Sequence, residues 1–292
     1  MRIGAVFPQT EIGADPAAVR GWAEAVEGLG YQHVLAFDHV LGAGRDTRPD
    51  WGRRYDSETL FHEVFVLFGY LAAVTSSVEL VTGVLVLPQR QTALVAKQAA
   101  EVDVLSGGRM RLGVGVGWND VEYEALGESF HNRGVRCEEQ VEVLRALWAN
   151  PTISHSGRWH HIDNAGIKPR PVRGRIPMWF NNNAEAMLRR IGRIGDGWLP
   201  QRAPDGVARA MVERVRAYAV DAGRAPDEIG LEPRLTLAGV PEGERADFVA
   251  GWLDLGATHL CVNTMGLGLE TVEDHVAALR DVLPVIRAVE LA

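Results

Sequence analysis

Apolar residues along this chain form two alternating patterns, short continuous runs and stripes with helical spacing. The runs are rich in β-branched and aliphatic residues, which is typical of parallel strands covered on both faces. Between the runs, apolar residues spaced by three and four predict amphipathic helices, such as one over Gln91–Ser106. The runs predict strands at Ile3–Phe7, Tyr31–Ala36, Leu80–Leu87, Arg109–Val116, Ile176–Phe180, Gly197–Pro200, Gly230–Leu237 and Thr258–Val262.

Eight predicted strands, each followed by a helix, favour a closed (β/α)8 TIM barrel over an open doubly wound sheet. We expect residues 1–292 to form a single domain of this kind. Two loops are long, one after the second strand at Leu41–Asp56 and one after the fourth strand, which includes a basic segment beyond Asn150. Since the functional site of such a barrel lies at the C-terminal strand ends, both loops are candidate lids.

The fourth predicted strand carries a series of alternate glycines. Gly113, Gly115 and Gly117 lie on one face of the strand, because side-chain positions alternate between faces. Either a bulky group approaches this face, or the glycines relieve crowding inside the barrel. The spacing is G-x-G-x-G and falls on the fourth strand, so it does not indicate the G-x-G-x-x-G loop of a Rossmann fold.

Composition and charge narrow the class of partner. The chain has 47% hydrophobic and 23% charged residues, and its formal net charge of −8 argues against nucleic-acid or anionic-membrane binding. The N-terminus lacks the pattern of a secretory signal, and the longest apolar run is too short for a bilayer, so we expect a cytoplasmic protein. Cys137 and Cys261 are too few for a disulfide framework or a thiolate metal site.

The predicted strand ends carry few ionisable groups. Asp38 and His39 follow the second strand, but the ends of the seventh and eighth strands offer no carboxylate, which disfavours a glycosidase. His160 and His161 would point to opposite faces of an extended segment, which disfavours a metallohydrolase. Glycines, tryptophans and amides dominate instead. This set suits a barrel that holds a planar cofactor and leaves the chemistry to it.

The run Asn181–Asn183 precedes a predicted helix that begins near Ala184. Backbone N–H groups at a helix N-terminus bind phosphate well, and Asn tolerates left-handed backbone angles, which an anion-binding turn often needs. Simple capping of the helix is the alternative.

Five segments, in their order and spacing, resemble the luciferase-like monooxygenase superfamily, and specifically its branch of coenzyme F420 (deazaflavin) dependent oxidoreductases. The resemblance extends over nearly the whole chain. The segments are TGVLVLPQRQ (Thr82–Gln91), AKQAAEVDVLSGGRMRLGVGVGW (Ala96–Trp118), KPRPV from Lys168, IPMWF from Ile176 and DGWLP (Asp196–Pro200). The resemblance implies a barrel that binds F420, or alternatively FMN, at the C-terminal ends of its strands.

The resemblance also implies roles for particular residues. Asp38 is expected to contact the ring system, and His39 to donate or accept a proton. The Gly83–Val84 bond matches a non-proline cis peptide that backs the central ring. The cofactor-binding set is Asp38, Thr82, Gly83, Val84, Gly115, Gly117, Trp118, Asn181, Asn182 and Asn183. The family's phosphate loop is usually glycine-rich, and here it is Asn181–Asn183.

Three functions remain open from the sequence. The first is F420-dependent hydride transfer to or from a small carbonyl, alcohol or activated alkene. The second is an FMNH2-dependent monooxygenase with a separate cofactor reductase, and the third is a non-catalytic flavin or deazaflavin carrier. A homodimer is compatible with each. Trp118 stands where sugar-phosphate dehydrogenase members carry a catalytic glutamate, which disfavours glucose 6-phosphate as the small-molecule substrate.

Overall fold

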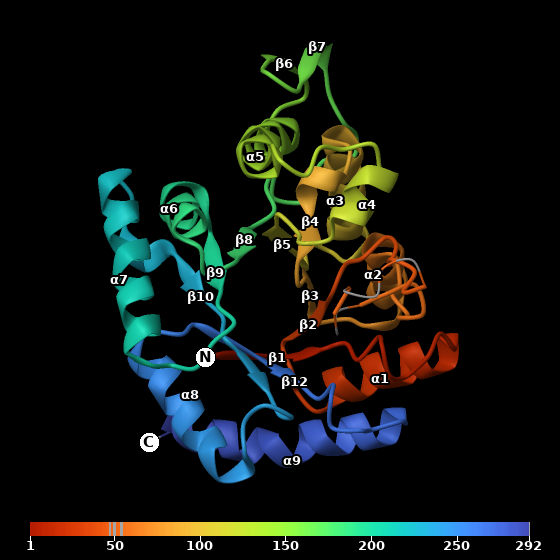
Figure 1. The fold of residues 1–292 in the computed structure, drawn as a ribbon, viewed down its shortest axis with the longest axis vertical. Coiled ribbons are helices and arrows are strands. Elements are labelled where there is room, and N and C mark those ends of the chain that lie inside the picture. The colour runs from red at the N-terminus through yellow and green to blue at the C-terminus, as the bar shows by residue number, and fades with distance from the viewer. Residues whose placement is uncertain (47, 49–50, 53–54, 292) are drawn as a thin grey trace.

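Strands and helices alternate along the chain in the computed structural model, which describes residues 1–46, 48, 51–52 and 55–291. Figure 1 shows the helices on the outside of the central strands. The strands of the described part are β1 (Arg2–Val6), β2 (His33–Ala36), β3 (Glu79–Thr82), β4 (Leu85–Val86), β5 (Met110–Gly115), β6 (Ile153–Ser156), β7 (His161–Ala165), β8 (Met178–Asn181), β9 (Gly197–Leu199), β10 (Gly230–Leu231), β11 (Arg234–Thr236) and β12 (His259–Asn263).

Several of the helices begin at a polar residue that caps the first turn. Asp15 accepts a 2.9 Å hydrogen bond from Ala17 N at the start of the first helix, and Asp205 accepts one of 2.7 Å from Ala208 N at the start of the seventh. The described α-helices are α1 (Pro16–Gly28), α2 (Val64–Val74), α3 (Thr92–Leu105), α4 (Asp120–Ala125), α5 (Arg133–Ala149), α6 (Glu185–Ile194), α7 (Gly206–Asp221), α8 (Arg245–Asp254) and α9 (Val272–Leu291). Short 3-10 turns lie at Leu87–Gln89, Pro226–Glu228 and Glu242–Glu244.

Within the described residues, ten strands form one curled parallel sheet in the order β10-β9-β8-β5-β3-β2-β1-β12-β11, with β4 added beside β5. Two predicted strands are each divided. The third becomes β3 and β4, separated by Gly83 and Val84, whose peptide bond is cis. The seventh becomes β10 and β11, separated by Glu232 and Pro233, because proline has no N–H for the ladder. The two ends of the strand order are therefore consecutive pieces of one segment, 230–236.

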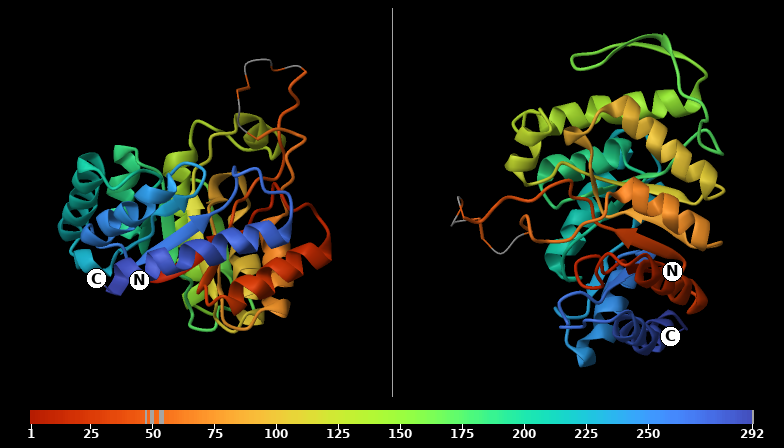
Figure 2. Two further views of the ribbon diagram at one scale, coloured as in Figure 1. Left: turned by 90° about the horizontal axis from the view of Figure 1, so that it is seen from below. Right: turned by 90° about the vertical axis from the view of Figure 1, so that its right-hand side faces the viewer.

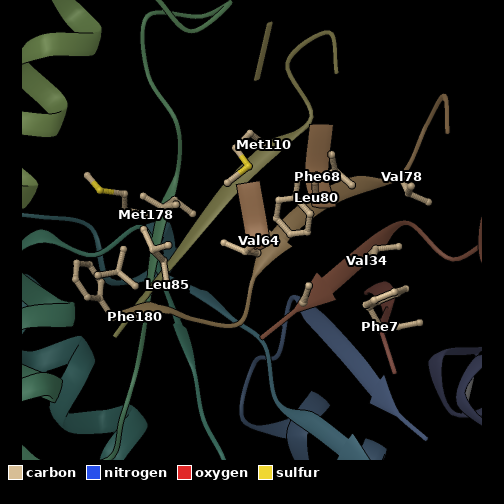
Figure 3. Close-up of a cluster of buried hydrophobic side chains, with 14 of the residues drawn as sticks. Phe7, Val34, Val64, Phe68, Val78, Leu80, Leu85, Met110, Met178 and Phe180 are labelled. Carbon is tan, nitrogen blue, oxygen red and sulfur yellow. The ribbon is translucent and has the colours of Figure 1, made fainter. Parts of the chain in front are cut away.

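The apolar core lies between the outward faces of the strands and the helices. Figure 3 shows part of it, with side chains from β2, β3, β5 and β8 packed against those of α2. The labelled residues are Phe7, Val34, Val64, Phe68, Val78, Leu80, Leu85, Met110, Met178 and Phe180. All of them are buried, as the continuous apolar runs predict for strands covered by helices.

The inward faces of the strands hold a buried ionic network that the apolar patterns do not predict. Glu232 accepts a hydrogen bond from Arg111 and lies 2.9 Å from Nε2 of His33, while Arg111 Nε donates to Glu79 at 2.9 Å. Burial raises the pKa of Glu232, but Arg111 and His33 outweigh it and hold that pKa well below its usual range. The potential metal-ligand atoms of His33, Glu232 and Cys261 lie within 4.8 Å of one another. In this structure the Glu232 carboxylate forms an ion pair with Arg111.

The segment after Asn150 contains an antiparallel hairpin, β6–β7, that the sequence analysis did not predict. It lies on the outer side of α5 (Figures 1 and 2). Glu139 of α5 accepts hydrogen bonds from the N–H groups of Arg158, Trp159 and His160 at the turn of this hairpin. The hairpin is thereby fixed to the helical layer.

The two ends of the chain lie near each other (Figure 2), and the Met1 amino group is 2.7 Å from the Glu290 carboxylate. Across the described residues, every helix is too short or too polar to cross a bilayer.

Candidate functional site

A cavity of about 600 Å³ opens at the C-terminal ends of the strands. Residues that follow β1, β2, β3, β5, β8, β9 and β12 contribute to its wall, together with residues of β11. Most of the sequence-predicted site residues meet here. Those that line the cavity are Asp38, His39, Gly83, Val84, Gly115, Gly117, Trp118, Asn181 and Asn182.

Thr82 and Asn183, which the sequence analysis assigned to cofactor binding, do not line this cavity. Thr82 is fully buried, and its hydroxyl donates a 2.7 Å hydrogen bond to the Gly113 carbonyl, so it joins β3 to β5. The Asn183 side-chain oxygen is buried and finds no hydrogen-bond partner among the described residues. The order of residues along a strand end predicts which positions are near a site, but not the direction of each side chain.

His39 is held by a buried carboxylate from another part of the chain. Its Nδ1 lies 3.2 Å from Oε2 of Glu122 in α4, and only 1% of the Glu122 side chain is exposed. The other Glu122 oxygen accepts from the backbone N–H groups of Val40 and Leu41. Burial raises the pKa of Glu122, but the hydrogen bonds from His39 and these N–H groups lower it more, so the pKa lies below its usual value. An ionised Glu122 accepts a hydrogen bond from Nδ1–H of His39. Nε2 is then the nitrogen of His39 that remains for another partner.

Three aromatic rings surround the His39 ring. The ring centroids of Tyr55, Phe61 and Trp118 lie 5.3, 4.9 and 5.6 Å from that of His39, all in edge-on arrangements. Tyr55 and Phe61 come from the long segment after β2, so this loop does contribute to the cavity. In contrast, the basic segment after Asn150 contributes no lining residue, so its prediction as a lid is wrong for this cavity.

Asp38 lines the cavity, but its carboxylate is engaged by the protein. Oδ1 accepts a 2.6 Å hydrogen bond from Arg90, and Oδ2 accepts one of 3.2 Å from Val86 N. Arg90 also donates to Glu63 at 2.9 Å. Burial raises the pKa of Asp38 against the opposing effect of Arg90. Asp38 therefore ties the end of β2 to β4 and to the start of α3, in addition to facing the cavity.

Gly113 and Gly115 lie two residues apart in β5 and so share a face, whereas Gly117 lies beyond the end of the strand. Each of the three occupies a place where a side chain would collide with protein. A Cβ on Gly113 would lie 1.9 Å from the Thr82 carbonyl oxygen, and one on Gly115 would lie 2.3 Å from Val84 Cγ2. Gly117 has a φ of +64°, which non-glycine residues rarely adopt. Close packing between β5 and the divided third strand is enough to require these glycines. Of the two readings from the sequence, the structure favours relief of crowding.

The asparagine run lies at the start of α6. Asn182 has a φ of +144°, and its side-chain oxygen accepts a 2.8 Å hydrogen bond from Ala184 N. Asn181 Nδ2 donates to the Leu199 carbonyl at 2.6 Å, which joins β8 to β9. Ala184 occupies the N-cap position of α6 and supplies no side-chain cap. The first N–H groups of the helix therefore stay available beside the cavity.

Sequence reasoning missed Glu11, Tyr55, Glu122 and Arg234. Glu122 had one available signal, since Asn119 caps α4 and Glu122 follows three residues later, a spacing that often gives a reciprocal cap. Here the carboxylate turns to His39 instead. Arg234 interrupts an apolar strand run with a charge, which is also a visible signal. Nothing in the local sequence distinguishes Tyr55 or Glu11 from other loop residues.

Comparison with known proteins decides the family. The model for "luciferase-like monooxygenase" matches residues 1–246. The chain belongs to this family. An uncharacterised protein of Mycobacterium tuberculosis (strain ATCC 25618 / H37Rv) is 32% identical, over 88% of this chain and 90% of its own length.

A curated relative and a solved structure extend the comparison. The FMNH2-dependent dimethylsulfone monooxygenase of Pseudomonas fluorescens (strain Pf0-1) is 30% identical over 68% of this chain, and the chain spans 52% of its length. A solved F420-dependent secondary alcohol dehydrogenase, in complex with an F420–acetone adduct, has a TM-score of 0.80 with 18% identity. That match covers 98% of both chains and establishes a shared fold. Relatives by sequence thus include a monooxygenase, and the likeness to the solved dehydrogenase shows the fold alone.

Proposed function

We propose that this luciferase-like family member is an F420-dependent oxidoreductase that transfers a hydride to or from a small carbonyl, alcohol or activated alkene. His39 is the proton donor or acceptor in this proposal. The observation that carries it is the placement of His39 on the cavity wall, with Nδ1 held by the buried Glu122 carboxylate. We also propose that β10 and β11 act as one strand, which makes the sheet an eight-stranded (β/α)8 barrel.

The cavity fits a planar tricyclic cofactor. Its volume of about 600 Å³ falls within the range of cofactor pockets, about 300–1,000 Å³. In this proposal Gly83, Val84 and Trp118 lie against the ring system. Asn181 and Asn182 lead to the uncapped N-terminus of α6, which attracts a phosphate.

When bound, the deazaflavin supplies the hydride chemistry. Reduction of a carbonyl to an alcohol takes up one proton with each hydride, and the reverse reaction releases one. Nε2 of His39 has no partner among the described residues, so it is available for this proton. An ionised Glu122 stabilises the positive charge that the imidazole carries while it holds the extra proton.

A non-catalytic carrier would have no use for such a group. In a barrel closed around a bound ligand, a polar nitrogen near that ligand is expected to have a hydrogen-bond partner within the protein. Among the described residues Glu122 is the one hydrogen-bond partner of the His39 side chain, and this, together with the position of His39 on the wall, supports a catalytic role.

The second candidate is an FMNH2-dependent monooxygenase that receives its cofactor from a separate reductase. Sequence identity of 30% to the dimethylsulfone monooxygenase favours it. Because the chain spans about half the length of that relative, the shared part supports a related cofactor site more than a shared reaction.

An anaerobic turnover assay separates the two. We expect reduced F420 to be oxidised in the presence of a panel of small aldehydes, ketones and enones. The reaction is monitored by the rise in absorption of the oxidised deazaflavin. The same panel is assayed with reduced FMN under air. Turnover that requires reduced FMN and oxygen, with none on reduced F420, would overturn the proposal in favour of the second candidate.

A further inference from the structure

Arg234 brings a positive charge into the cavity. It lies at the start of β11, where its backbone pairs in register with Cys261 of β12, and its side chain lines the cavity wall. Its guanidinium lies over the Phe37 ring, 5.1 Å from the ring centroid. Phe37 immediately precedes Asp38 and His39, so the charge is on the side of the cavity that holds the proposed proton donor.

The side chain of Arg234 makes no hydrogen bond or ion pair with any residue that the structure describes. The nearby acids are engaged elsewhere. Glu232 binds His33 and Arg111, while Glu11 accepts a 2.8 Å hydrogen bond from Gly266 N and lies 3.3 Å from Nε2 of His275. Arginine stays charged inside a protein, and a partly buried charge without a partner is costly. This arrangement is explained if a ligand supplies the partner.

Tyr55 provides a second group for the same ligand. Tyr55 and Arg234 both line this cavity, and burial raises the pKa of the Tyr55 hydroxyl while the charge of Arg234 lowers it. The Tyr55 ring also contacts the His39 ring at 5.3 Å. Arg234, Tyr55 and His39 therefore surround one part of the cavity. The α6 N-terminus, proposed for the cofactor phosphate, follows Asn181 at the end of β8. Arg234 shares a small pocket with Asn181, so F420 affinity has to be measured alongside anion binding.

We propose that Arg234 binds an oxyanion of the substrate, a carboxylate or a sulfonate, and so restricts this enzyme to acidic substrates. That the bound anion is a substrate rests on the proposed function, whereas the existence of the anion site does not. A planar guanidinium donates two parallel hydrogen bonds to two oxygens of such a group, and the hydroxyl of Tyr55 can donate a third. The anion would hold the reacting carbon of a small molecule near His39.

The test is a calorimetric titration of the full chain at low ionic strength with three probes. Propionate and methanesulfonate carry the two oxyanions, and propionamide is the neutral match of propionate. We expect at least one anion to bind more tightly than propionamide. Arg234→Gln should weaken that anion about 10- to 100-fold and leave propionamide unchanged, since it removes a charge-assisted pair. Arg234→Lys should retain part of the preference.

Arg202→Gln is the matched control, because Arg202 pairs with Asp205 at 2.8 Å and does not line this cavity. F420 affinity is measured on the same variants by absorption. The inference is overturned if wild type shows no preference for either anion, or if Arg234→Gln and Arg234→Lys bind anions like wild type. A loss of F420 affinity in Arg234→Gln would also overturn it, because the charge would then serve the cofactor. Failure of wild type to bind F420, with anion binding that depends on Arg234, would contradict the proposed function alone.

Discussion

The His39–Glu122 pair shows how a single residue gains its function from a distant part of the chain. His39 follows β2, whereas Glu122 lies in α4, 83 positions further along. Glu122 is buried, accepts two backbone N–H groups beside His39 and fixes the orientation of the imidazole ring. A histidine held in this way presents Nε2 in one orientation, which suits the proton transfer that we propose for His39.

We expect His39→Ala to lower turnover with reduced F420 by about 10²- to 10⁴-fold, the usual contribution of a general acid or base. The F420 dissociation constant should stay nearly unchanged. Glu122→Gln should also lower turnover, by less, because the imidazole keeps its place but loses the carboxylate that stabilises its charged form. Steady-state kinetics and absorption titrations of both variants provide the measurement. Equal turnover of wild type and His39→Ala would remove His39 from the mechanism.

Sequence patterns predicted His39 and Asp38 at the cavity but not what holds them. The partners of both residues come from other elements, Glu122 for His39, and Arg90 and Val86 for Asp38. Contacts between residues far apart in the chain depend on the packing of whole elements, which no local pattern encodes. For the same reason, Asp38 was expected mainly to contact the cofactor ring, whereas its carboxylate also serves a buried ion pair.

Among the elements, the most informative is the contact between β5 and the divided third strand. Gly115 lies where a Cβ would meet Val84, and Val84 itself lines the cavity. The sequence analysis placed Gly113 and Gly115 on one face of this strand but left the cause open, and Gly117 lies beyond the strand. The structure resolves the cause because the space beside each glycine is filled by a neighbouring strand.

We therefore expect Gly115→Ala to destabilise the cofactor-free protein by about 1–3 kcal/mol, the usual cost of overpacking a filled interior. The second substitution Val84→Ala should recover part of that loss, since it removes the atom that the new Cβ meets. Thermal or urea unfolding of the single and double variants measures both effects. If the cofactor-free single variant is as stable as wild type and only its F420 binding is lost, the glycine serves the cofactor instead.

Element prediction failed where charge or turn chemistry replaced hydrophobic pattern. The eight apolar runs located the strands, but Glu232–Pro233 divided one of them and Gly83–Val84 another. The β6–β7 hairpin lies on the outside of α5 and has mostly exposed residues, so it carries no apolar run to reveal it. The Arg111–Glu232 pair was invisible for the opposite reason, because its charged residues lie on faces expected to be apolar.

For the whole molecule, the architecture determines where chemistry can occur. A curled parallel sheet brings the C-terminal ends of its strands to one side, where the cavity opens. The inward faces below that cavity are filled by the network of Arg111, Glu232 and His33. The sequence predicted the side on which the site lies because strand direction follows from chain order. Arg234, which we propose as an anion-binding residue, was identified as a cavity residue only with the fold.

The most direct test of the account is a crystal structure of the protein with F420. We predict that the deazaflavin ring lies against Gly83 and Val84, that its phosphate lies near the start of α6, and that His39 lies within about 5 Å of the hydride-carrying carbon, as productive positioning requires. Arg234 should remain free of the cofactor. A ring bound outside the cavity, or a His39 side chain whose nitrogens both turn to protein groups and away from the ring, would contradict the central claim.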